Sequence, residues 1–180
     1  MRSRTKSTKT VEYDDEAVEA LFSFPNPVNE KAARVVAGVV LASVLVVLGT
    51  GFYWLLIPLA YGFWARVLTG PTLSPLGFLA QRVIAPRLGA PKPVPGPPKR
   101  FAQGMGAAMA TAAVLLALVL GEHGAADAVL VAFAIAAGLE SIFAICLGCQ
   151  IFARLMALGL VPDSVCVECA DLSGRLSAAS

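Results

Sequence analysis

Charged residues are scarce in this sequence, and the residue combinations of common catalytic sites are missing. Only 14% of the 180 residues are charged and 57% are hydrophobic, whereas soluble domains carry about 25% charged and less than about 50% apolar residues. The single histidine, His123, belongs to no Ser/His/Asp set and no H-E-x-x-H motif, and there is no glycine-rich phosphate loop. These absences exclude an ordinary soluble domain, and they argue against a stand-alone enzyme and a nucleic-acid partner.

The first 30 residues also lack an apolar segment. Residues 1–30 run from basic to acidic to Pro/Asn-rich, so they do not match a cleaved signal peptide. Their composition predicts a polar, largely disordered cytoplasmic tail.

Long apolar blocks account for much of the remaining chain. One block, 31–68, is interrupted at 49–51, and the other, 100–158, is interrupted at 121–127. A helix of about 17–25 residues spans the bilayer core, and an open sheet cannot satisfy its backbone in lipid. We therefore predict an all-α membrane protein with four transmembrane helices arranged as two hairpins. The predicted spans are 32–48, 51–68, 101–120 and 127–150.

The basic residues predict how these hairpins are oriented. None of the 14 Lys and Arg residues lies in either interruption, while the second interruption carries Glu122 and Asp127. Cytoplasmic loops of membrane proteins carry an excess of Lys and Arg. Both termini should therefore be cytoplasmic, and both hairpin tips should face outward.

Two further polar segments connect and follow the hairpins. Residues 69–99 are rich in proline, and within them 74–86 alternate apolar and basic positions. This pattern indicates an interfacial amphipathic helix, followed by a stiff polyproline-like linker. Residues 159–180 are predicted to form a cytoplasmic tail that contains two of the four cysteines.

Glu140 is the only acidic residue well inside a predicted span. A carboxylate at that depth costs several kcal/mol unless it is paired or protonated. On a continuous helix Glu140 lies opposite Cys149 and about 120° from Cys146, so it is poorly placed to act as their base. Two roles remain open for it: a functional group, or a hydrogen bond to Gln103 or Thr111 that joins two helices.

The four cysteines form two C-x-x-C pairs, Cys146/Cys149 and Cys166/Cys169. Cytoplasmic cysteines are normally kept reduced, so stable disulfides are not expected on that side. Cys146 and Cys149 lie one helical turn apart on one face, where Gly148 keeps the turn accessible, and they could act as a redox pair. Their predicted place toward the C-terminal end of a helix, in an apolar setting, disfavours the reactive thiolate.

The same cysteines also fit a single metal site. The spacing C-x2-C-x16-C-x2-C falls within the range of four-cysteine zinc sites. A turn at Gly159 and Pro162 would bring the two pairs together, and zinc would keep all four sulfurs deprotonated. In a third alternative, the tail pair exchanges electrons or sulfur with the membrane pair.

Two motifs carry a family resemblance. The segment "PKRFAQGMGAAM" opens the third predicted span, and "FAICLGCQIFA" ends the fourth. Over residues 26–154 this layout resembles the bacterial integral membrane family DUF4395. The resemblance implies four spans in a bacterial plasma membrane and an association with thioredoxin-like or sulfurtransferase proteins. Only Cys146, Gly148 and Cys149 match the family's C-x-G-C motif, whereas the second cysteine pair and the acidic N-terminal tail lie outside the family pattern.

The residues and the resemblance together predict a membrane-anchored thiol-redox or sulfur-transfer partner of a soluble thioredoxin-like or sulfurtransferase protein. In this scheme Cys149, nearer the membrane surface, takes part in the exchange and Cys146 resolves the intermediate. The alternative is a structural or scaffolding membrane subunit in which Cys146, Cys149, Cys166 and Cys169 hold zinc. Small residues in the third and fourth spans indicate close helix packing and leave a homo-oligomer open.

Overall fold

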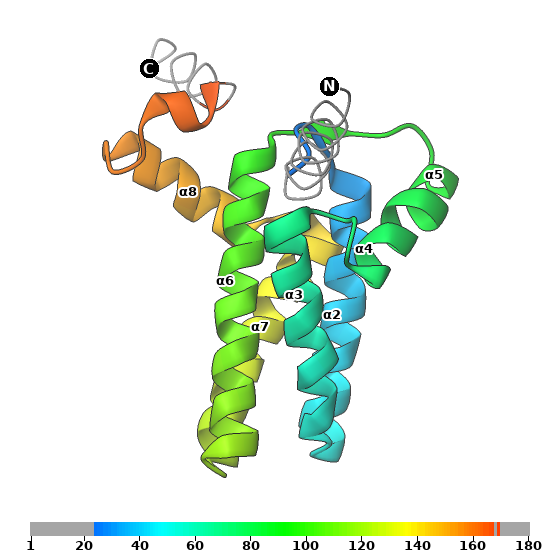
Figure 1. Cartoon of the computed structure of the whole chain (residues 1–180), viewed down its shortest axis with the longest axis vertical. Coiled ribbons are helices and arrows are strands. Elements are labelled where there is room, and N and C mark those ends of the chain that lie inside the picture. Colours follow the sequence, from blue (N-terminus) through cyan, green and yellow to red (C-terminus); the bar gives the residue numbers. More distant parts are fainter. Residues whose placement is uncertain (1–23, 168, 170–180) are drawn as a thin grey trace, which may run out of the picture.

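Helices that run alternately up and down form the body of the protein (Figure 1). The computed structural model describes residues 24–167 and Cys169. The long helices are α2 (Glu30–Thr50), α3 (Leu56–Thr69), α6 (Gly96–Val114) and α7 (His123–Phe143). The π-helical turn η3 (Leu115–Val119) extends α6 to a combined length of 24 residues. The shorter elements are β1 (Val28–Asn29), η1 (Tyr53–Leu55), α4 (Pro75–Leu79), η2 (Ala80–Ile84), α5 (Ala85–Arg87), β2 (Pro93–Val94), α8 (Leu147–Ala157) and η4 (Asp163–Val165).

The long helices pack most extensively across the two hairpins, although α6 and α7 also pack on each other. α2 packs mainly against α7 and α3 packs mainly against α6, while α2 and α3 touch little. The predicted hairpins are therefore not independent units, because together they enclose one core.

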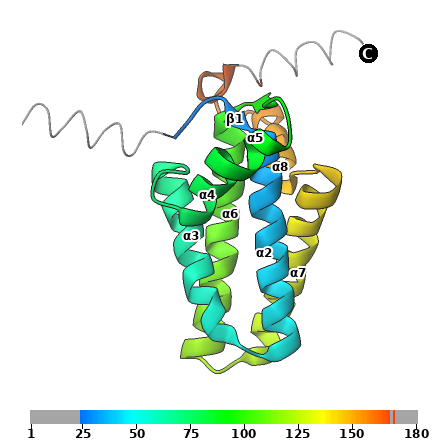
Figure 2. The same ribbon diagram turned by 90° about the vertical axis from the view of Figure 1, so that its right-hand side faces the viewer.

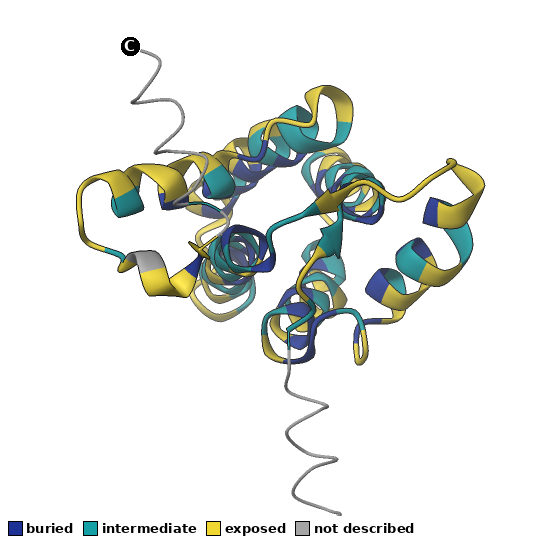
Figure 3. Ribbon diagram, turned by 90° about the horizontal axis from the view of Figure 1, so that it is seen from above, coloured by how far each residue is buried: buried dark blue, intermediate teal, exposed yellow. Residues whose placement is uncertain are grey.

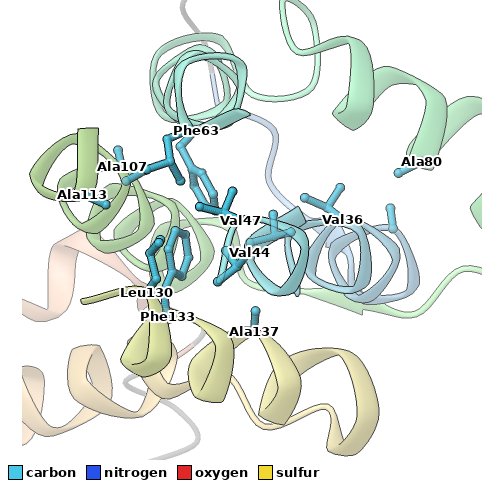
Figure 4. Close-up of a cluster of buried hydrophobic side chains, with 14 of the residues drawn as sticks. Val36, Val44, Val47, Phe63, Ala80, Ala107, Ala113, Leu130, Phe133 and Ala137 are labelled. Carbon is cyan, nitrogen blue, oxygen red and sulfur yellow. The ribbon is translucent and has the colours of Figure 1, made fainter. Parts of the chain in front are cut away.

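Valines spaced three or four residues apart on one face of α2 form the centre of this core. They are Val36, Val40, Val44 and Val47. Val44 and Val47 lie between the side chains of α3 and α7 (Figure 4). Across the core, the rings of Phe63 and Phe133 lie 5.3 Å apart. Gly106 of α6 sits directly against Phe63, because a Cβ at that position would overlap the ring.

The outer surface of the bundle is apolar. Large side chains such as Leu45 (53% exposed) and Ile135 (58% exposed) point away from a core built largely of alanine and valine. Soluble monomers rarely expose contiguous apolar patches of more than a few hundred Å². α2, the α6–η3 helix and α7 are each long and apolar enough to cross a membrane, which confirms the predicted all-α membrane class. α3 has only 14 residues, so a fourth span stays a prediction.

A small ribbon ties the start of α2 to the start of α6. β1 and β2 pair antiparallel, with Val28 opposite Val94. Asn29 caps α2 by accepting a hydrogen bond from the amide of Lys31 at 3.1 Å. α6 begins at Gly96, five residues before the predicted span, and its first turn contains two prolines. Proline is tolerated there because the first amides of a helix have no intrahelical acceptor, so the expected polyproline-like linker is largely helix.

Two helical segments leave the bundle on opposite sides at the end where α2 begins (Figures 1 and 3). One is the continuous stretch α4–η2–α5, within the segment predicted to hold an interfacial helix, and Figure 2 shows it lying across the side of the bundle near that end. Buried Arg66 of α3 donates to the Ser74 hydroxyl at 3.1 Å and so attaches this stretch to the bundle. The other segment is α8.

Candidate functional site

The helix that carries Glu140 ends before the first cysteine pair. α7 stops at Phe143, and Ala144 adopts a left-handed conformation with φ 59°. The Arg34 guanidinium donates to the carbonyl oxygens of Ser141 and Ile142 at 3.0–3.2 Å, which places a cation at the negative end of the helix dipole. The prediction of a continuous span over 127–150 is therefore wrong, and α8 leaves the bundle at an angle (Figure 1).

Cys146 is the N-cap residue of α8. Its backbone is extended, and its carbonyl oxygen accepts the first helical hydrogen bond from the amide of Gln150 at 3.1 Å. Cys149 lies one turn along α8, and its Sγ donates a hydrogen bond to Cys146 Sγ over 2.8 Å. The pair thus lies at a helix N-terminus, not toward a C-terminal end as predicted. This is the end whose partial positive charge stabilises a thiolate.

The hydrogen bond between the sulfurs makes the two thiols unequal. It lowers the pKa of Cys146, whereas burial and the Glu140 carboxylate raise that pKa and the Lys99 ammonium lowers it. The same hydrogen bond raises the pKa of Cys149, and burial acts in the same direction. At Cys146 the hydrogen bond outweighs burial and the Glu140 carboxylate, so its pKa is lowered and Cys146 is the cysteine that ionises first.

An ion pair between α6 and α7 lies beside the thiols. Lys99 Nζ donates to Glu140 Oε1 at 2.7 Å, and the two side chains are 10% and 18% exposed. Glu140 therefore has a partner that the sequence did not indicate. Gln103 and Thr111, its predicted partners, instead accept hydrogen bonds from side chains of α3.

The first turn of α8 packs directly on α6. A Cβ at Gly148 would lie 2.6 Å from the Cα and Cβ atoms of Ala102, so only glycine allows this approach. Further along, the rings of Phe101 and Phe152 lie 5.7 Å apart. Gly148 was predicted to keep the turn accessible, and in the structure it is instead a buried packing residue.

The cysteine pair separates two cavities. A cavity of about 280 Å³ inside the bundle is lined by Cys146 and Glu140, but not by Cys149. A second pocket, of about 460 Å³, is lined by both cysteines and reaches Lys92, which is exposed to solvent. Cys146 is 8% exposed and Cys149 is half-buried, so Cys149 is the more accessible sulfur of the pair.

The second cysteine pair is oxidised in the structure. Cys166 and Cys169 form a disulfide, with their Cα atoms 5.3 Å apart, within the range that a disulfide bridges. The expectation that all four cysteines stay reduced does not hold for this pair. Among the described residues, no group of three or more His, Cys, Asp or Glu side chains could hold a metal ion. The described residues thus do not bring the four cysteines into one group, and the four-cysteine zinc site stays a prediction.

Sequence reasoning missed Lys99, Arg34 and Ala144, which together build this site. The two cations were interpreted only as markers of the cytoplasmic side, and no glycine or proline marks the end of α7. One signal was available: the apolar stretch 127–158 is longer than the 17–25 residues or so that one span needs. Such an excess indicates that the helix must end within the stretch.

Comparisons with known proteins place the chain in a family. The family model described as "Domain of unknown function (DUF4395)" matches residues 28–157, which include all the long helices, α8 and the first cysteine pair. No curated protein and no solved structure matches the chain. Since the matched region covers well over half of the sequence, the chain belongs to the DUF4395 family.

Proposed function

We propose that this chain is a membrane-anchored thiol–disulfide exchange protein whose Cys146–Cys149 pair reacts with a soluble thioredoxin-like protein. One observation carries the proposal: two free thiols lie 2.8 Å apart at the N-terminus of α8. Helix N-termini lower the pKa of cysteines, and this is where C-x-x-C pairs of redox proteins react.

The outer pocket offers the partner a place to reach the pair. Its walls contain Val94 and Ile145 as well as the exposed Lys92, so both apolar and charged groups are available for contact. Cys149 is the accessible sulfur, and we assign it the contact with the partner.

The exchange proceeds in two balanced steps from the oxidised pair. A thiolate of the partner attacks Cys149 Sγ, the Cys146–Cys149 bond breaks, and Cys146 leaves as a thiolate. The second thiol of the partner then attacks the mixed disulfide and releases Cys149. Low-pKa thiols leave fastest in such reactions, and the pKa of Cys146 is lowered by its hydrogen bond. The partner loses two hydrogens and the pair gains them.

The proposal includes the predicted topology. In it, η1 and α3 together form a fourth span, both termini are cytoplasmic, and the membrane is a bacterial plasma membrane. Arg34, Arg66 and Lys99 support this orientation, because they lie where α2 and α6 begin and α3 ends, and basic residues concentrate on the cytoplasmic side. The thiol pair would then face the cytoplasm.

Two alternatives have weaker support. A zinc-holding scaffold would need the sulfurs of Cys166 and Cys169, which are bonded to each other. Sulfur transfer would use the same Cys146–Cys149 pair, but one nucleophilic cysteine suffices for it, so it does not account for the second thiol at 2.8 Å.

The test is the mass of the purified full-length protein after incubation with reduced or oxidised thioredoxin. We expect the oxidised Cys146–Cys149 pair to gain two hydrogens from reduced thioredoxin, and the reduced pair to lose two hydrogens to oxidised thioredoxin. Cys149→Ser should abolish this change, and the Cys166→Ser/Cys169→Ser variant is the matched control that should retain it. Gain of a sulfur atom on Cys146 or Cys149, or a bound zinc ion lost on chelation, would overturn the proposal in favour of the corresponding alternative. No change with either form of thioredoxin would also count against it.

A further inference from the structure

The cavity inside the bundle is apolar except at one end. α2, α3, α6 and α7 line it with hydrophobic side chains, and the first turns of α8 lie against it. Its larger apolar side chains include Val40, Phe63, Met105, Met109, Phe133 and Ile151. Its polar groups are Gln103, Glu140 and Cys146. A ligand bound here would have an apolar body and a polar edge directed at Cys146.

The size of the cavity suits a substituted aromatic ring. It measures about 280 Å³, and an apolar cavity of about 150 Å³ holds a benzene ring. It lies among the three helices that are apolar enough to span a membrane, which favours a lipid-soluble ligand. Pockets between the helices of bundles are common ligand sites.

The position of Cys146 links this cavity to the thiol chemistry. Cys146 lines both the inner cavity and the outer pocket, while Cys149 lines the outer pocket alone. An acceptor in the inner cavity therefore meets the sulfur that ionises first, and a protein in the outer pocket meets the more accessible one. The Lys99–Glu140 pair, at 2.7 Å, supplies a proton-carrying group beside the polar edge.

We propose that the inner cavity binds the ring of a lipid-soluble quinone, which oxidises the Cys146–Cys149 dithiol; this inference rests on the proposed thiol exchange. The Cys146 thiolate adds to a ring carbon, forming a C–S bond and placing an electron pair on a quinone oxygen, which takes up one proton. The Cys149 thiolate then attacks Cys146 Sγ. The S–S bond forms, the C–S bond breaks, and the second oxygen takes up a proton. Two thiols and one quinone become one disulfide and one hydroquinone.

The site thus passes two electrons from a soluble dithiol protein to the membrane. Both protons come from the two thiols, and Glu140 carries them from the sulfurs toward the ring oxygens. The quinone is the oxidant that regenerates the disulfide for the next partner molecule.

The experiment follows oxidation of the reduced full-length protein by decylubiquinone in nanodiscs without oxygen. We expect one hydroquinone for each disulfide formed at Cys146–Cys149. Ala136→Phe fills the cavity, since Ala136 lines it, and should slow the oxidation at least about tenfold, the factor that 1.4 kcal/mol produces. Ala128→Phe is the matched control on the exposed face of α7 and should oxidise like the wild type.

The result separates this inference from the function on which it rests. Exchange with reduced thioredoxin should be the same in the wild type and in both variants. If thioredoxin exchanges but decylubiquinone does not oxidise the pair, or oxidises Ala136→Phe as fast as the wild type, the quinone site is refuted and the exchange function stands. If thioredoxin does not exchange with the wild type, the proposed function itself fails.

Discussion

At the scale of single residues, the hydrogen bond between the two sulfurs controls which cysteine ionises. Cys149 donates and Cys146 accepts, and a thiolate accepts a hydrogen bond more strongly than a thiol does. The bond therefore lowers the pKa of Cys146 while it raises that of Cys149. Position along the helix alone does not explain the difference between the two pKa values, since both cysteines lie in the first turn of α8.

Two substitutions of Cys149 isolate this bond. Cys149→Ser keeps a donor at the same place and Cys149→Ala removes it, so the pKa of Cys146 should be higher in the alanine variant. The measurement is the rate of Cys146 alkylation by iodoacetamide against pH. The midpoint of the profile should lie at higher pH for Cys149→Ala, because the thiolate then appears only at higher pH. Identical midpoints would show that the helix terminus, not the hydrogen bond, sets the reactivity.

At the scale of elements, the contact between α8 and α6 determines where the thiols lie. The contact depends on Gly148, whose missing side chain lets the first turn of α8 approach Ala102. Core positions that receive an extra methyl group lose about 1–3 kcal/mol of stability. A displacement of α8 would also open the boundary between the two cavities that Cys146 lines.

Gly148→Ala should therefore move α8 away from α6. We expect a lower melting temperature and faster alkylation of Cys146, which is only 8% exposed in the native packing. Gly104→Ala on α6 is the control, because a Cβ there meets no atom within 4 Å, and it should leave both properties unchanged or stabilise the helix. Unchanged alkylation in Gly148→Ala would show that this contact does not position the pair.

The ion pair between Lys99 and Glu140 joins α6 to α7 beside the first turn of α8. Removing one partner of a buried pair leaves an uncompensated charge and costs about 3–5 kcal/mol, whereas replacing both by apolar residues is often neutral. In the pair between Lys92 and Glu30 the cation is solvated, because the Lys92 side chain is 66% exposed while that of Glu30 is 12% exposed, so Lys92 should contribute less to stability than the buried Lys99 does.

Thermal unfolding in detergent tests this difference. Lys99→Met should lower the melting temperature strongly, and the double variant Lys99→Met/Glu140→Leu should recover most of the loss. Lys92→Met should change it little. If Lys99→Met is as mild as Lys92→Met, then the pair is solvated and does not hold the helices together.

At the scale of the whole molecule, Lys and Arg side chains gather at one end of the bundle. The Lys31, Arg34, Arg66 and Lys99 side chains lie at the end where the lateral segments leave the bundle (Figure 1). The opposite end holds Tyr53, whose ring stacks on His123 at 4.7 Å and whose hydroxyl donates to Asp127 at 2.9 Å. Among the described residues, Lys and Arg occur at the first end and not at the second, and basic residues concentrate on the cytoplasmic side of membrane proteins; this supports the proposed orientation.

Single cysteines introduced into a variant without the four natural ones report this topology. Glu122→Cys, at the exposed tip before α7, should react with a membrane-impermeant maleimide added outside intact cells. Arg87→Cys, at the exposed end of α5, should react only after the cells are opened. Labelling of Arg87→Cys from outside, or of neither position, would contradict the proposed orientation.

The sequence alone determined the membrane class, the long helices α2, α6 and α7, and the uneven distribution of cations. The membrane class and the long helices follow from the apolar content of each segment, because the free energy of transferring a residue into lipid depends mainly on that residue itself. The distribution of cations can be read directly from the sequence. The C-x-x-C pair itself was also evident from the spacing of Cys146 and Cys149.

Only the tertiary structure decided where that pair sits. At the end of α7, Arg34 donates to the carbonyl oxygen of Ser141, 107 residues away in the chain, and the first turn of α8 approaches α6 closely where Gly148 meets Ala102. The partner of Glu140 is Lys99, 41 residues distant. No local pattern encodes these contacts, because each depends on two helices meeting at a particular depth and angle.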